Sequence, residues 1–83
     1  MYVVVYPDLC GTMHVGLESD DGRACELLYE GPDEVRLENK AFNVAFLYGE
    51  KHGLKVFLQG IKGKLLLQDS PLRTGQIPAW MLE

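Results

Sequence analysis

Hydrophobic and polar residues follow two different periods along this chain, and the changes of period mark the elements that we expect. From residue 39 to residue 52, apolar residues recur at the 3.6-residue spacing of a helix, with polar residues on the opposite side. Asn39 suits the N-cap of this helix, and Gly53 suits the first position after its end. Gly49 lies on the apolar side, so we expect the helix backbone to approach a strand closely there.

The residues before this helix have the patterns of three strands. Residues 2–6 are apolar throughout, which favours a central strand covered on both faces. Residues 12–17 alternate as a half-buried strand does, and residues 23–29 return after a turn at 19–22 whose Asp-Gly pair suits a tight hairpin. The residues expected to share one face of the third strand are Cys25, Leu27 and Tyr29.

The residues after the helix predict a second hairpin. Residues 54–59 alternate, the glycine-flanked residues 60–63 have the length of a hairpin loop, and residues 64–68 form the returning strand. Residues 32–38 fit either a helix that begins at Pro32 or a short extended piece, and both alternatives stay open.

The chain ends in a short C-terminal element at residues 77–82, either one helical turn or an extended piece. The pattern as a whole predicts an α+β fold: an antiparallel sheet of order βββ-α-ββ, with one amphipathic helix at about residues 39–52 packed on one face. With 83 residues and a hydrophobic fraction of 47%, the chain is expected to form a single compact domain over residues 1–83.

Composition and sequence pattern indicate the cellular compartment in which the protein is expected. No apolar run approaches the ~18 residues of a membrane span, and the first residues lack the pattern of a secretory signal. Two cysteines, Cys10 and Cys25, are too few for a disulfide scaffold. We therefore expect reduced thiols in a cytoplasmic protein without a membrane partner, although the spacing leaves a Cys10–Cys25 bridge open.

Charge is distributed unevenly between the two parts of the chain. Residues 1–38 contain nine acidic and two basic residues, a net charge of −7, whereas residues 39–83 contain six basic and three acidic residues, a net charge of +3. This asymmetry predicts one acidic face and one mildly basic face, the total being −4.

Residues with reactive or metal-binding side chains do not form a known catalytic pattern. Cys10, His14, Cys25 and His52 fall in none of the spacings that bind zinc, and no glycine-rich phosphate loop is present. Asp8, Cys10 and His14 include the residue types of a nucleophilic site, but no family signature surrounds them. We expect no enzymatic activity, metal or cofactor, with Cys25 in the core and His14 on the surface of its strand.

Part of the chain resembles a known fold family. Three strands, a helix that opens NKAFNVA and the strand LKVFLQG look like the first half of a ribonuclease H domain, with Asp8 where that family has a catalytic acid. Phe42 and Gln59 stand where the family needs two further acids, so the resemblance implies no nuclease activity. Tyr6-Pro7-Asp8 is similar to the opening of HicB-type antitoxins, which look like truncated relatives of that fold, although their second Pro-Asp strand is missing here.

Surface-prone residues indicate a protein that binds another protein. Trp and Met are enriched in interface cores, and the C-terminal segment IPAWMLE is too short to bury itself. We therefore expect a small regulatory module that covers a partner surface or forms a homodimer, in the style of phage-encoded inhibitors such as anti-CRISPR proteins. The expected contact residues are Trp80, Met81, Leu47, Ile61, Asp20, Asp21, Glu30, Asp33 and Glu34. The alternative is a nucleic-acid-associated or antitoxin-like regulator that uses Lys55, Lys62 and Lys64.

Overall fold

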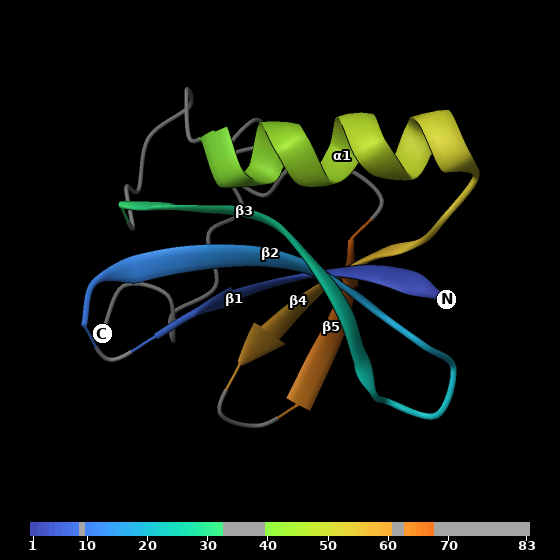
Figure 1. Cartoon of the computed structure of the whole chain (residues 1–83), viewed down its shortest axis with the longest axis horizontal. Helices are drawn as coiled ribbons and strands as arrows, with labels where there is room; N and C mark the ends of the chain where they lie inside the picture. The colour runs from blue at the N-terminus through green and yellow to red at the C-terminus, as the bar shows by residue number, and fades with distance from the viewer. Residues whose placement is uncertain (9, 33–39, 61–62, 68–83) are drawn as a thin grey trace.

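The computed structural model of the chain describes residues 1–8, 10–32, 40–60 and 63–67. Within these residues, three strands precede a helix and two strands follow it (Figure 1). The elements are β1 (Tyr2–Pro7), β2 (Thr12–Glu18), β3 (Ala24–Pro32), α1 (Lys40–His52), β4 (Val56–Gly60) and β5 (Gly63–Leu67). The predicted α+β class and the order βββ-α-ββ are therefore confirmed, while residues 32–38, except Pro32, and the C-terminal element lie outside the described residues.

The five strands form one sheet in the order β3-β2-β1-β4-β5, which confirms the central position of β1. The β1–β2, β2–β3 and β4–β5 pairs are antiparallel, but β1 and β4 are parallel, so the sheet is mixed rather than wholly antiparallel as predicted. The direction follows from the connection. Strand β3 runs parallel to β1, and α1 carries the chain back across the sheet, so β4 starts in the direction of β1.

The core lies between α1 and one face of the sheet. Alternate residues of three strands point into it, as the alternation in the sequence predicts, and all are at most 5% exposed. They are Val3 and Val5 of β1, Met13, Val15 and Leu17 of β2, and Val56 and Leu58 of β4. The helix contributes Ala41, Phe42 and Ala45, of which Phe42 is the largest fully buried side chain described.

The end of α1 fixes how the helix sits on β4. Gly53 has the positive φ angle of 66° that a glycine after a helix adopts, and the Leu54 N–H donates to the Gly49 carbonyl at 2.8 Å. This bond closes a Schellman motif. A Cβ atom at Gly49 would lie 2.9 Å from Val56 Cγ2 and 2.9 Å from the Leu54 carbonyl oxygen, so only glycine allows this approach. The predicted close contact of Gly49 is therefore confirmed.

Strand β3 is irregular, and its predicted facing is wrong. The register shifts once between Val15 and Gly16, where the partners on β3 change from Tyr29 to Leu27, and again between Leu17 and Glu18. Tyr29 packs against the core, whereas Leu27 is 52% exposed. Each irregularity adds a residue to one strand and reverses the alternation beyond it.

Cys25 was predicted to lie in the core, and this is also wrong. Cys25 falls within the second irregularity of β3 and is exposed, as Cys10 is, and both thiols are free. Because the extra residue shifts the register there, Cys25 has no place in the alternation that fills the core.

Candidate interaction surface

The sheet face opposite α1, here called the open face, carries an apolar row that crosses all five strands. The register places Leu27 beside Gly16, Gly16 beside Val4, Val4 beside Phe57, and Phe57 beside Leu66. No charged residue interrupts this row. Val4 is 1% exposed, but the two ends are open, with Leu27 52% and Leu66 43% exposed.

The sheet bends around its open face, and a polar bridge spans the bend. Lys64 of β5 and Glu18 of β2 are separated by two strands in the sheet. Their side chains nevertheless form an ion pair, with Lys64 Nζ 3.3 Å from Glu18 Oε1. The same Glu18 oxygen accepts a 2.7 Å hydrogen bond from the Tyr2 hydroxyl, and Lys64 Nζ lies 5.6 Å from the centroid of the Tyr2 ring. Tyr2 also meets Phe57 edge to face, with ring centroids 5.1 Å apart.

The bridge changes how its members titrate. The bond to the Glu18 carboxylate, followed by burial, raises the pKa of Tyr2 above its ordinary value. The bonds to Tyr2 and then to Glu18 raise the pKa of Lys64. Both shifts favour the protonated forms that hold the bridge together at neutral pH.

A hollow of about 220 Å³ opens beside this bridge, between β1, β2 and the first half of β3. Its walls are mostly apolar, with Glu18 and Glu26 as the acidic lining residues. Glycine at position 16 lets its neighbours pack closely, since a Cβ there would lie 3.2 Å from the Glu26 carbonyl oxygen and 3.7 Å from the Tyr6 ring. The complete lining is Val4, Tyr6, Gly16, Leu17, Glu18, Ala24, Cys25, Glu26 and Leu27.

A second polar cluster joins the ends of β1 and β2. Asp8 Oδ2 lies 2.8 Å from His14 Nε2, while Asp8 Oδ1 accepts bonds from the N–H groups of Cys10 at 2.8 Å and Thr12 at 3.0 Å. His14 stacks on Tyr6, with ring centroids 5.0 Å apart. The bond to His14 and then the bond to the Thr12 N–H lower the pKa of the Asp8 carboxyl.

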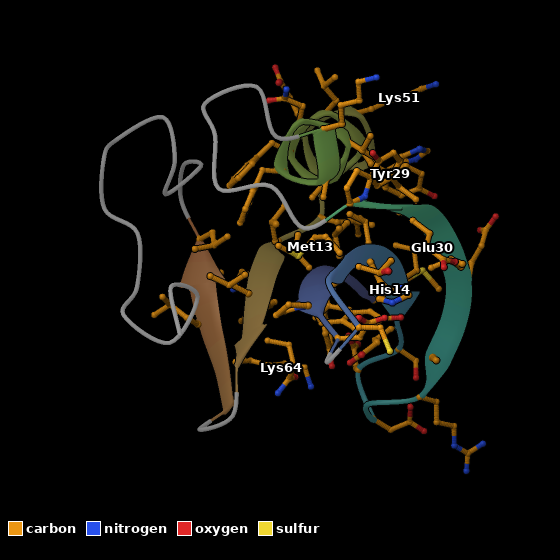
Figure 2. The ribbon with its side chains drawn as sticks, turned by 90° about the vertical axis from the view of Figure 1, so that its left-hand side faces the viewer. Met13, His14, Tyr29, Glu30, Lys51 and Lys64 are labelled. Carbon is orange, nitrogen blue, oxygen red and sulfur yellow. The ribbon has the colours of Figure 1, made fainter. Side chains whose placement is uncertain are left out.

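These contacts describe a turn that is closed by a side chain. The Cys10 contact uses its backbone N–H, and no group of three His, Cys, Asp or Glu residues in the described part of the chain could hold a metal ion. Figure 2 shows His14 and Lys64 on the side of the sheet away from α1, and Met13 and Tyr29 between sheet and helix.

The acidic contact residues predicted from the sequence lie at the hairpin between β2 and β3 and along β3. Asp20 is highly exposed and pairs with the Met1 amino group, while Asp21 accepts from the Ser19 hydroxyl and lies 3.3 Å from Arg23 Nε. Glu30 is exposed on β3, opposite His14. The hairpin and β3 therefore both belong to the acidic part of the chain, residues 1–38.

The predicted apolar contact on the helix lies elsewhere. Leu47 is 67% exposed on α1, on the other side of the sheet from the open face, so it does not join the hairpin acids in one surface. Of the alternative nucleic-acid residues, Lys55 is exposed and Lys64 is held by Glu18, which leaves less free positive charge than the sequence suggested. The predicted residues outside the described ranges are Trp80, Met81, Ile61, Asp33, Glu34 and Lys62.

Sequence reasoning missed Leu27 and Leu66 as surface residues. Both belong to apolar runs that looked like core strands, and their exposure follows from the register and from their places on edge strands. One signal was present in the sequence, because the adjacent pair Leu27-Leu28 breaks the alternation of the strand and marks an irregularity.

Comparisons of this chain with models of protein families, with curated proteins and with solved structures found no match. The resemblance to the ribonuclease H fold and to HicB-type antitoxins therefore stays a prediction. Where that family needs its further acids, the structure has the buried Phe42 and, on β4, Gln59. In the described part of the chain, no helix is long and apolar enough to span a bilayer.

Proposed function

We propose that this protein is a small binding module that regulates a partner protein by covering part of its surface. The observation that carries the proposal is the apolar row of the open face, which exposes Leu27 and Leu66 at its two ends. Exposed apolar residues are ordinary one at a time. Here two exposed leucines end one uncharged row whose middle residue, Val4, is buried, and apolar surface rimmed by polar groups is typical of a contact surface.

The polar groups around the row support the same function. Carboxylates line the hairpin and β3, so a partner would meet apolar contacts inside a polar rim, which is the common layout of protein interfaces. A protein that acts by covering a surface needs no reactive group of its own. The Asp8–His14 pair accords with this, because it ties a turn together through backbone bonds.

Capture of a partner tests the proposal. The full chain is immobilised, exposed to a bacterial lysate and washed, and the retained proteins are identified and quantified by mass spectrometry. We expect one partner in stoichiometric amount, which Leu27→Glu loses because the substitution puts a charge into the apolar row. The matched control Leu47→Glu places the same charge on the helix and should retain the partner.

Two outcomes would contradict this. If wild-type protein retains no stoichiometric partner, not even another copy of itself, the binding function is wrong. If Leu47→Glu loses the partner and Leu27→Glu keeps it, binding stands but takes place on the helix rather than on the open face.

A further inference from the structure

The hollow beside β3 has a lining that suits one long side chain. Val4, Tyr6 and Leu27 give aliphatic and aromatic walls to its volume of about 220 Å³. Long side chains with an apolar stem and a charged head bury the stem along such walls and keep the head near polar groups.

The charge around the hollow selects the sign of that head. Residues 12–32 contain five carboxylates and one arginine, so their net charge is 1 − 5 = −4 with His14 neutral. Three of these carboxylates already have a cation, because Glu18 pairs with Lys64, Asp20 with the Met1 amino group and Asp21 with Arg23. Glu26, which lines the hollow, and Glu30, farther along β3, pair with no cation in the described part of the chain.

We propose that the hollow receives a lysine or arginine side chain from a basic segment of the partner protein. The stem packs against Tyr6 and Leu27, and the cationic head meets the carboxylates at the rim, where charge-assisted hydrogen bonds form. This inference rests on the proposed function and specifies the chemistry of its partner.

Other occupants fit the same surface less well. An acidic peptide or a nucleic-acid backbone would be repelled by the unpaired carboxylates of β3. A bare metal ion lacks ligands, since the described residues hold no cluster of three suitable groups. A second copy of this chain is the remaining competitor, because the exposed surface of α1 carries Lys40 and Lys51.

Selection from random peptides tests the chemistry directly. The full chain is used to select from a display library of peptides of about 12 residues, which reach up to ~40 Å when extended. We expect the enriched peptides to carry lysine or arginine next to aliphatic residues. Their affinity should fall several-fold between about 50 mM and about 300 mM salt, because opposite charges at the rim contribute to binding.

The two free cysteines report where a selected peptide binds. Cys25 lines the hollow and Cys10 does not, and both are exposed. A bound peptide should therefore slow alkylation of Cys25 by iodoacetamide and leave Cys10 unchanged, as measured by mass spectrometry on wild-type protein. Equal rates at Cys25 with and without peptide would overturn the proposal.

A pair of variants separates the hollow from a general charge effect. Ala24→Arg puts a cation on the lining of the hollow, where Ala24 is exposed, and should weaken the peptide at least about tenfold. Asn43→Arg adds the same charge to the exposed side of α1 and should weaken it much less. Circular dichroism confirms that both variants are folded.

Three results would overturn the inference: no enriched peptide, enriched peptides without basic residues, or equal affinities for Ala24→Arg and wild type. Light scattering that shows a dimer of wild type and a monomer of Ala24→Arg would assign the hollow to a second copy instead. A lysate partner that Ala24→Arg retains in full would leave the proposed function standing and refute only the basic occupant.

Discussion

Replacement of Gly49 by alanine should destabilise this protein, although the same change in an exposed helix stabilises it. In a free helix interior, alanine is favoured over glycine by about 1 kcal/mol. Here the added Cβ would lie 2.9 Å from both Val56 Cγ2 and the Leu54 carbonyl oxygen. Real Cβ atoms do not come that close, so the helix or β4 must shift.

The size of the effect follows from the contacts that must give way. Overpacking of this kind costs about 1–3 kcal/mol. The carbonyl of Leu54 cannot simply turn aside, because the N–H of the same residue closes the Schellman motif on Gly49 at 2.8 Å. Loss of that bond costs a further ~0.5–1.5 kcal/mol. After subtraction of the helix preference, Gly49→Ala should lose about 0.5–3.5 kcal/mol.

Urea unfolding followed by far-ultraviolet circular dichroism measures this difference. In a chain of this length, the expected loss lowers the melting temperature by at least about 2 °C. Asn43→Ala is the matched control, because Asn43 is exposed on the same helix, and this change should raise stability by about 0.5 kcal/mol. If Gly49→Ala stabilises the protein as much as Asn43→Ala does, the close approach of α1 to β4 is wrong.

Three further predictions concern the core and the two polar clusters. Phe42→Ala removes the largest fully buried side chain described and should lower the free energy of unfolding by about 3–5 kcal/mol, a large part of the ~4–12 kcal/mol typical of a chain of this length. Its urea transition should therefore move far toward zero denaturant. The transition of Phe42→Leu should move much less. Glu18→Gln removes the carboxylate that raises the pKa of Tyr2, so the Tyr2 phenol should ionise at lower pH. An ultraviolet titration measures this, with Tyr2→Phe variants as the reference. An unchanged pKa of Tyr2 would disprove the hydrogen bond between Tyr2 and Glu18. The Asp8 carboxyl has a folded pKa below its unfolded value of 3.8, so its contribution is complete above pH 3.8 and disappears as the pH falls through the lower folded value. Asp8→Asn should therefore flatten the decline of melting temperature below pH 3.8, and parallel declines would contradict the Asp8–His14 contact.

The helix and the order of elements could be predicted because their signals are local. The 3.6-residue period, the terminal Gly53 and the space-limited Gly49 all lie within one segment, and each has a direct physical meaning. The parallel pairing of β1 and β4 could not be predicted in the same way. Strand direction depends on where the chain returns after α1, and alternation along a strand is the same in parallel and antiparallel pairs.

The contacts of the open face could not be predicted from the sequence for a similar reason. Its bridge joins Glu18 to Lys64 across 46 positions of sequence and two intervening strands, and no local pattern encodes such a contact. The facing of Leu27 depends on an irregularity that only the pairing of β2 and β3 reveals. The acidic hairpin, in contrast, was visible in the sequence because turn residues and charges are read directly from it.

The parallel contact of β1 with β4 has a consequence for how the chain reaches its native state. The β2–β3 and β4–β5 hairpins join neighbouring segments and can form within microseconds. Val3 meets Val56 only after a loop of about fifty residues has closed, which is entropically costly before its contacts form. The pairing of β1 with β4 at the centre of the sheet should therefore form last. During synthesis, β1 can pair with β4 only after β4 has left the ribosome.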